Sequence, residues 1–197
     1  TASNKSVWLI GGIAAAIAIA AIIAVATQSG SDEVVTGIEE FNTVEVSGEP
    51  LPQFSDSATD KAIGMTAPVL TGKGFTGNTI VTTPGAPTLL VFLAHWCPHC
   101  QREVPRLVQW NSAGLVPSGL DVIAITTSTD PASPNFPPSE WLAREEFPAR
   151  WPVMTDSGEK TAASAMGVSG FPFFVLLDEQ GKVALRISGE VETEALT

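Results

Sequence analysis

Both cysteines of the chain lie in one motif, Trp96-Cys97-Pro98-His99-Cys100, with two residues between them. As a thiolate, Cys97 can attack a disulfide bond, and Cys100 can then resolve the mixed disulfide that forms. No organic cofactor is needed, because the two sulfur atoms carry the electrons themselves. The motif therefore predicts thiol–disulfide exchange, with Cys97 as the attacking thiol and Cys100 as the resolving thiol.

The segments on either side of the motif predict how it is held. The run Thr88–Ala94 is short and apolar, as is typical of a buried strand, and a helix-like stretch extends from Pro98 to about Ser112. Cys97 then occupies the N-cap of this helix and Pro98 its first position. Free N–H groups and the positive end of the helix dipole favour a thiolate there, and a protonated His99 would add to this effect.

Two further residues of the predicted helix bear on its chemistry and shape. Glu103 follows Cys100 by three residues, which places the two on nearly the same helix face. It is either a solvated helix carboxylate or, if desolvated beside Cys100, a proton acceptor for the resolving thiol. Pro105 cannot donate a backbone hydrogen bond, and we expect it to bend the helix.

The charge of the chain excludes one class of partner and marks one segment. The formal net charge is −11, and an acidic protein is a poor ligand for nucleic acid. Residues 27–60 hold eight acidic residues and no Lys or Arg, with few large apolar side chains. This composition predicts a flexible linker over 27–60, within which a short strand around Val44–Val46 is an alternative.

The N-terminal residues predict export. Val7–Ala26 is long enough and apolar enough to cross a membrane, and Lys5 is the only charge that precedes it. These features indicate a short cytoplasmic segment at 1–6, a single transmembrane anchor at 7–26 and everything after residue 27 outside the cytoplasm. The alternative is a cleaved signal peptide, because Ala24-Val25-Ala26 fits a cleavage site. In both cases the dithiol faces an oxidising compartment.

Residues 61–197 have the composition of a folded domain with an α/β pattern. In chain order we expect a hairpin of Val69–Leu70 and Thr79–Thr82, the strand Thr88–Ala94, the helix Pro98–Ser112, the strand Leu120–Thr127, a helix Ser139–Phe147 capped by Ser139, a strand Trp151–Met154, a helix Gly158–Met166, and a hairpin of Phe173–Leu177 and Lys182–Ile187. This order predicts a mixed β-sheet flanked by helices.

The order of these elements, with the Trp-Cys-x-x-Cys motif between strand and helix and Gly170-Phe171-Pro172 before the last hairpin, resembles the thioredoxin fold over about residues 61–190. Within that fold the chain is similar to the membrane-anchored, extracytoplasmic TlpA/ResA-like group. The similarity rests on the anchor, the N-terminal hairpin with Ala67-Pro68 ahead of it, and Glu103-Val104-Pro105 after the second cysteine.

The resemblance implies partners and further site residues. It implies exchange with the thiols or disulfides of exported proteins, sometimes apocytochromes c during haem attachment, and a redox partner in the membrane or outside the cytoplasm. It also implies that Pro172 is a cis-proline that faces the dithiol and holds the substrate chain, next to Phe171. Trp96 would form a flat apolar rim beside the dithiol that suits a peptide.

The sequence departs from the pattern of the group in three places, and one of them, Pro98-His99, leaves the direction of electron flow open. Val91 stands where thioredoxins proper carry a buried Asp, so Glu103 is the better candidate acceptor. Pro98-His99 resembles the strongly oxidising DsbA proteins, whereas the overall build resembles reductases. Phe171 is bulky, so the peptide groove can differ from that of the group.

The alternative function is metal carriage or redox-inactive binding on the same fold. A copper or zinc site would use Cys97, Cys100, His99 and His95, and a partner would have to complete it because the chain holds no other Cys or His.

Overall fold

The computed structural model describes residues 37–192 and residue 196, which belong to one compact unit that begins at Gly37. The predicted segments 1–6 and 7–26 lie outside the described residues. Within the part that is described, no helix combines the length and the apolar character that crossing a membrane requires.

The centre of the unit is a five-stranded mixed sheet in the order β6-β5-β4-β7-β8. Its strands are β4 (Thr88–Leu93), β5 (Asp121–Thr126), β6 (Val153–Thr155), β7 (Phe173–Leu177) and β8 (Val183–Ser188). β4 pairs in parallel with β5 and antiparallel with β7, so that Val91 lies opposite Ala124 on one side and Phe174 on the other. All six residues of β4 are buried, as expected for a strand covered on both faces.

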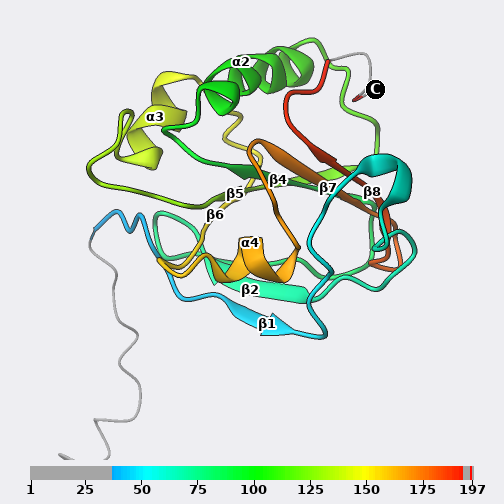
Figure 1. Ribbon diagram of the computed structural model, residues 1–197. Coiled ribbons are helices and arrows are strands. Elements are labelled where there is room, and N and C mark those ends of the chain that lie inside the picture. Colours follow the sequence, from blue (N-terminus) through cyan, green and yellow to red (C-terminus); the bar gives the residue numbers. More distant parts are fainter. Residues whose placement is uncertain (1–36, 193–195, 197) are drawn as a thin grey trace, which may run out of the picture. The chain divides into compact units, whose positions relative to one another are not determined.

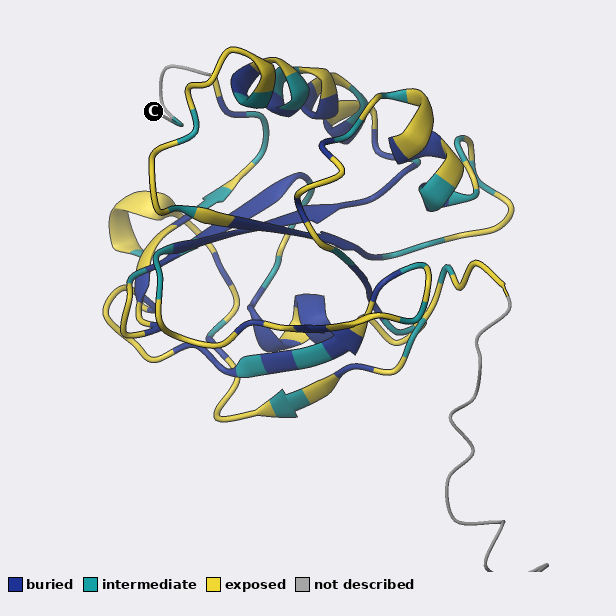
Figure 2. Ribbon diagram, turned by 180° about the vertical axis from the view of Figure 1, so that it is seen from behind, coloured by how far each residue is buried: buried dark blue, intermediate teal, exposed yellow. Residues whose placement is uncertain are grey.

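Helices and a second sheet cover the two faces of this sheet (Figure 1). The elements are α2 (Pro98–Ser112), α3 (Pro138–Arg144), α4 (Thr161–Ala165) and the single 3-10 turn η1 (Ser57–Thr59). Figure 1 shows α2 and α3 on one side, and α4 with β1 and β2 on the other. The central strands β4, β5 and β7 are largely buried, whereas the edge strand β8 and the outer face of α2 include exposed residues (Figure 2).

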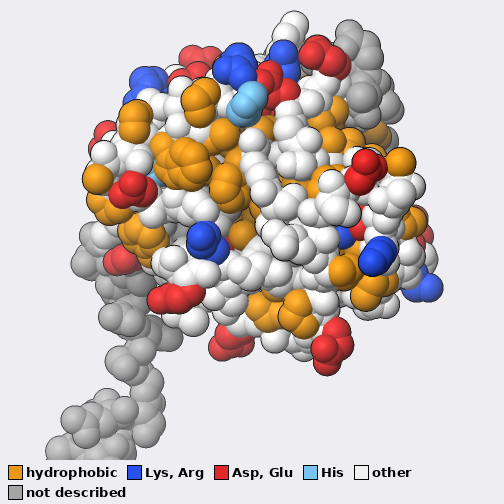
Figure 3. Space-filling model, viewed as in Figure 1, with side chains coloured by type: hydrophobic (Ala, Val, Ile, Leu, Met, Phe, Trp, Pro, Cys, Tyr) orange, Lys and Arg blue, Asp and Glu red, His pale blue; other side chains and the backbone are white. Residues whose placement is uncertain are grey.

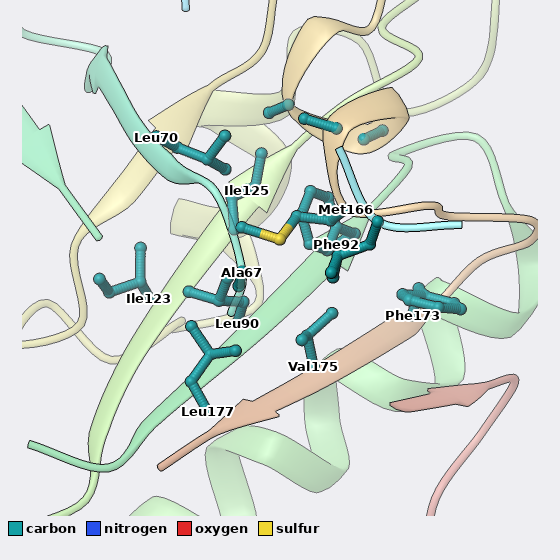
Figure 4. Packing of buried hydrophobic residues seen from close by; sticks show 14 of the residues in the cluster. Ala67, Leu70, Leu90, Phe92, Ile123, Ile125, Met166, Phe173, Val175 and Leu177 are labelled. Atoms are coloured by element: carbon teal, nitrogen blue, oxygen red, sulfur yellow. The ribbon is translucent and has the colours of Figure 1, made fainter. Parts of the chain in front are cut away.

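Alternation along β4 divides the core into two clusters. Leu90 and Phe92 point to the α4 side, where they meet Phe173, Val175 and the other residues labelled in Figure 4. Leu89, Val91 and Leu93 point to the α2 side, where their cluster contains both cysteines. The strand that leads into the motif therefore also packs against the helix that follows the motif.

The predicted linker over 27–60 is wrong for residues 37–60, and the domain does not begin at residue 61. β1 (Glu45–Ser47) pairs antiparallel with β2 (Val69–Lys73), and β2 pairs with β3 (Thr79–Val81), which makes a second sheet of three strands. Val44, Leu51 and Phe54 are buried in the core. The acidic composition wrongly predicted a linker, because a few apolar side chains that pack into the core are enough to hold an acidic segment against the domain.

The short helices differ from prediction at their ends. α3 begins at Pro138 after Pro137, so Ser139 is not its N-cap. Instead, the backbone N–H and the hydroxyl of Ser139 donate to the Glu40 carboxylate, which supplies negative charge at the start of the helix. α4 is also shorter than the predicted helix Gly158–Met166. By contrast, α2 has the predicted bounds and remains one helix through Pro105.

A buried ion pair ties the N-terminal part of the unit to the sheet. The Arg186 guanidinium of β8 donates to both oxygens of Asp60, with N–O distances of 2.8 and 2.5 Å. It also donates to the carbonyls of Pro52 and Met166, each at 2.9 Å. The hydrogen bond from Arg186 lowers the pKa of Asp60. The Arg186 side chain thus binds Pro52, Asp60 and Met166, which no hydrogen bond of the sheet joins.

We expect Arg186→Ala to lower the free energy of unfolding by about 3–5 kcal/mol, because it leaves the Asp60 carboxylate buried without its partner. Urea denaturation followed by tryptophan fluorescence measures the change. Lys182→Ala, an exposed residue just before β8, is the matched control and should change stability by less than about 0.5 kcal/mol. Equal stability of the two variants would contradict the role given to Arg186.

Candidate active site

The dithiol lies where a buried strand ends and a helix begins. Cys97 is the N-cap of α2, with φ −74° and ψ 119°, and Pro98 is the first helical residue. The Cys97 N–H donates to the carbonyl of Ala94 at 3.0 Å, which forms the turn between β4 and α2. Both cysteines are free thiols, so the structure represents the reduced form. The predicted placement of the motif is confirmed.

The loop before β7 faces Cys97 from across the site. The Cys97 Sγ lies 3.5 Å from the carbonyl oxygen of Phe171, to which the thiol can donate. The Phe171–Pro172 peptide bond is cis, as the resemblance implied. Trp96 meets Phe171 edge to face, with ring centroids 6.2 Å apart, and its indole N–H donates to the carbonyl of Ser128 at 2.7 Å. Trp96, Phe171 and Pro172 are thus brought together around the sulfur.

The two thiols differ in their surroundings. Cys97 is 7% exposed, whereas Cys100 is fully buried. The Cys100 Sγ accepts a hydrogen bond from the N–H of Ala94 at 3.4 Å. Desolvation raises the pKa of Cys100 well above its ordinary range. The inner thiol therefore keeps its proton, and it needs an acceptor at the moment when it attacks.

Glu103 is a buried carboxylate on the inner face of α2, not a solvated one. Its Oε2 accepts from the N–H of Val191 at 3.1 Å and lies 3.5 Å from a guanidinium nitrogen of Arg106. Its Oε1 has no partner among the described residues. Desolvation raises the pKa of Glu103 to about 7, against the opposing effects of Val191 and Arg106. A carboxyl that titrates near neutral pH is suited to accept and return a proton.

Val91 cannot act as the proton acceptor for Cys100, so Glu103 is the candidate for that role. Val91 is fully buried in the cluster that contains both cysteines, and it has no group that can bind a proton. Glu103 also contributes to the high pKa of Cys100 through its negative charge, so the two groups sense each other. Glu103 is thus a titratable neighbour of Cys100 on the buried side of α2.

His99 points outward into an ionic cluster. Its Nδ1 lies 2.7 Å from a carboxylate oxygen of Glu190 and 2.8 Å from a guanidinium nitrogen of Arg102. Its side chain is 60% exposed. On this face of the molecule a histidine lies among acidic and basic side chains, next to a group of hydrophobic ones (Figure 3). That His99 tunes the dithiol stays a prediction, but any such effect acts through a histidine already paired with a carboxylate.

His95 has a structural position that its sequence context did not reveal. Its Nδ1 lies 2.7 Å from the carbonyl of Pro134, to which it donates, and its Nε2 accepts from the N–H of Asp130 at 3.1 Å. Asn135 and Gln101 donate to its backbone carbonyl. His95 therefore fastens the loop after β5 to the end of β4. Because both of its ring nitrogens are engaged, it is not available as the ligand that the metal hypothesis assigned to it.

Sequence reasoning missed Glu190 and the two arginines that bind it. Arg102 and Arg106 follow His99 at helical spacing, so their common face could have been noticed. Glu190 follows β8 and lies 88 positions beyond Arg102. No local pattern connects residues that far apart, and only the sheet topology brings them together.

Comparisons with known proteins agree with the geometry. A family model described as Redoxin matches residues 47–196. The thiol-disulfide oxidoreductase ResA of Bacillus thuringiensis (strain Al Hakam) is 31% identical over 117 residues, which cover 57% of this chain and 60% of ResA. The thiol:disulfide interchange protein DsbE of Pseudomonas aeruginosa is 27% identical over 146 residues, which cover 74% of this chain and 68% of DsbE. The chain thus spans about three fifths of the length of the ResA relatives that it matches.

Solved structures show the same fold. A thiol:disulfide interchange protein DsbE from Chlorobium tepidum is 28% identical, with a TM-score of 0.56 over 68% of this chain and 92% of that one. StoA from Bacillus subtilis, at 20% identity and a TM-score of 0.54, shares the fold over 68% of this chain and 96% of its own. The mixed α/β fold is therefore thioredoxin-like. The chain belongs to the Redoxin family, and within it to the TlpA/ResA-like group that its motifs indicated.

Proposed function

We propose that this chain is a membrane-tethered thiol–disulfide oxidoreductase that works outside the cytoplasm and exchanges disulfides with exported proteins. The observation that carries the proposal is the contrast between the two thiols. Cys97 lies at a helix N-terminus facing the Phe171 carbonyl, and Cys100 lies buried behind it beside Glu103. An outer nucleophile and an inner resolving thiol are what two-step disulfide exchange requires. The names of the ResA and DsbE relatives support the same activity.

The exchange proceeds in two balanced steps. The Cys97 thiolate attacks one sulfur of a substrate disulfide, which forms a mixed disulfide and releases the first substrate thiolate. Cys100 then transfers its proton to Glu103 and attacks the Cys97 sulfur, which releases the second substrate thiolate. The substrate gains two electrons and the chain is left with a Cys97–Cys100 disulfide. In reverse, the same steps oxidise a substrate dithiol. A membrane or exported redox partner then restores the starting form.

The substrate chain would lie across Trp96, Phe171 and Pro172. The Phe171 carbonyl that now faces the Cys97 thiol sits where a substrate backbone would approach the sulfur. Trp96 and Phe171 offer flat apolar contacts that accept many sequences. This arrangement suits exported polypeptides, and apocytochromes c are one such class that the resemblance to the TlpA/ResA-like group implies.

The reduction potential decides the direction of electron flow. The Cys97–Cys100 pair of the full chain is equilibrated against glutathione, and the fraction oxidised is measured by alkylation and mass spectrometry. A value near that of DsbA, about −120 mV, indicates an oxidant that forms disulfides. A value near or below that of thioredoxin, about −270 mV, indicates a reductase with a membrane electron donor. If no disulfide forms at any poise, the proposed function is wrong.

We expect Cys100→Ser to trap the mixed disulfide, because Cys97 can still attack but nothing resolves the product. With a disulfide-bonded peptide as substrate, the Cys100→Ser chain should accumulate as a covalent adduct that dithiothreitol releases. Cys97→Ser should form no adduct, and both variants should reduce insulin no faster than dithiothreitol alone. Mass spectrometry under non-reducing conditions measures the adduct. An adduct on Cys100 in the Cys97→Ser chain would reverse the assigned roles.

The Cys97→Ala, Cys100→Ala double variant separates this function from metal carriage. If the chain is a copper or zinc carrier, the wild type binds metal and does not reduce insulin, and the double variant loses metal binding. If the chain is an oxidoreductase, the wild type reduces insulin and the double variant does not.

We expect Glu103→Gln to slow resolution of the mixed disulfide by about 10²-fold near neutral pH, because the variant lacks the proton acceptor. In the wild-type chain the rate of this step should rise with pH through about 7, where Glu103 ionises, and Glu103→Gln should lose that rise. Stopped-flow fluorescence of a preformed mixed disulfide measures it. Glu159→Gln, an exposed carboxylate, is the control and should keep the wild-type profile. An unchanged profile in Glu103→Gln would exclude Glu103 as the acceptor.

The same variant tests the protonation of Glu103 without any activity. The folded protein holds this proton up to a pKa of about 7, whereas the ordinary value is 4.5. Between these values the folded state binds more protons than the unfolded state, so the contribution of Glu103 to stability falls as pH rises. The loss amounts to about 3 kcal/mol between pH 4.5 and 7 and should be absent from Glu103→Gln. Urea denaturation of both chains across this range measures the difference.

A further inference from the structure

The three residues after β8 contact three parts of the active site. The N–H of Gly189 donates to the carbonyl of Pro172 at 2.8 Å. The carboxylate of Glu190 binds the outer face of α2, and the N–H of Val191 donates to Glu103 at 3.1 Å. Residues 189–191 therefore join the cis-proline loop, the Cys-x-x-Cys helix and the buried carboxylate.

Glu190 is the anion at the centre of three basic side chains of α2. Its Oε1 accepts from Nη2 and Nε of Arg102 at 2.6 and 3.0 Å, and it lies 2.7 Å from Nδ1 of His99. Its Oε2 accepts from Nη1 of Arg106 at 2.9 Å. The Glu190 side chain is 20% exposed. Both carboxylate oxygens of Glu190 are thus engaged by side chains of α2, and these contacts hold the Glu190 side chain in one position.

The charges in this cluster act on Cys97. Hydrogen bonds from Arg102 and His99 lower the pKa of Glu190 to about 2, so it is ionised at neutral pH. The hydrogen bond to Glu190, and to a smaller degree a thiolate at Cys97, raise the pKa of Arg102. Arg102 lies in the second turn of α2, the helix whose N-cap is Cys97, and it binds Glu190, so both charges lie near the helix end that carries the Cys97 sulfur.

We propose that Glu190 is a positioning residue that makes the Cys97–Cys100 couple less oxidising, because it holds the side chains of His99 and Arg102 in place and neutralises the positive charge of Arg102 near the helix end that carries Cys97. The proposal rests on the function proposed above and adds to it a residue that sets the redox potential.

The sign of the effect follows from the redox couple. Reduction adds two electrons to the Cys97–Cys100 disulfide and breaks the S–S bond, and binding of protons then gives the dithiol. Only the reduced form can carry a thiolate at Cys97, so positive charge near Cys97 favours the reduced form and raises the potential. Glu190 lowers the positive charge at that place. Its removal must therefore favour the reduced form and make the disulfide a stronger oxidant.

We expect Glu190→Gln to shift the equilibrium with glutathione by about three- to tenfold toward the reduced dithiol, or about 15–30 mV for this two-electron couple. The side chain keeps its size and loses its charge. Glu192→Gln is the matched control, because Glu192 lies two residues further on, is 75% exposed and is 3.5 Å from Arg106. It should change the equilibrium by less than twofold. The full chain is used, with the alkylation assay described for the wild type.

A second variant distinguishes charge from structure. Arg102→Gln removes the cation that Glu190 neutralises, and it should shift the equilibrium in the opposite direction, toward the disulfide. Loss of a merely structural contact would move both variants the same way. Both shifts should shrink at high salt, because the cluster borders solvent.

The outcomes are distinct. If the wild-type chain forms no reversible disulfide, the proposed function fails and this inference fails with it. If the wild type has a measurable potential but Glu190→Gln matches Glu192→Gln, or becomes more reducing, only the role of Glu190 is overturned. If Glu190→Gln does not fold, a shift of Arg102→Gln toward the reduced dithiol overturns it equally.

Discussion

The burial of Cys100 against β4 is the constraint on which the site depends. Because β4 is covered on both faces, α2 must pack against it directly, and the first turn of α2 carries Cys100 to the inside and leaves Cys97 at the helix end. A fully buried thiol resists ionisation. The chain therefore needs a proton acceptor that is itself buried, and burial is also what brings the pKa of Glu103 to about 7. The packing of α2 against β4 thus makes Cys100 harder to ionise than an exposed thiol. It also buries Glu103, which raises the pKa of the carboxyl that can accept the Cys100 proton.

The parts of this arrangement that are encoded locally could be predicted from the sequence. The bounds of α2 follow from Pro98 at its start and from the helical pattern up to Ser112, and β4 follows from an uninterrupted apolar run. The N-cap position of Cys97 is a consequence of these two elements alone. Pro105 did not end α2, because a proline removes only one hydrogen bond and the packed face of the helix supplies the rest of its stability.

Other features depend on tertiary contacts that no local pattern announces. Residues 37–60 have the composition of a linker, but Val44, Leu51 and Phe54 each fill a place in the core, and Asp60 pairs with Arg186. In the same way, the sequence left Glu103 open as solvated or desolvated, because helical spacing fixes a face but not what covers that face. In the folded chain Glu103 is fully buried and its carboxylate binds the N–H of Val191, which follows it by 88 positions.

His99 shows why a motif is an incomplete guide to redox chemistry. Taken alone, a protonated histidine between two cysteines would favour a thiolate and therefore the reduced form. In the folded chain its Nδ1 lies beside a carboxylate that also binds two arginines, so its effect cannot be separated from theirs. The same backbone segment that delivers Glu190 also supplies the hydrogen bond to Glu103. Residues 189–191 therefore contact both the outer, charged face of α2 and the buried carboxylate on its inner face, so one short segment borders both groups on which the two proposed steps of exchange depend.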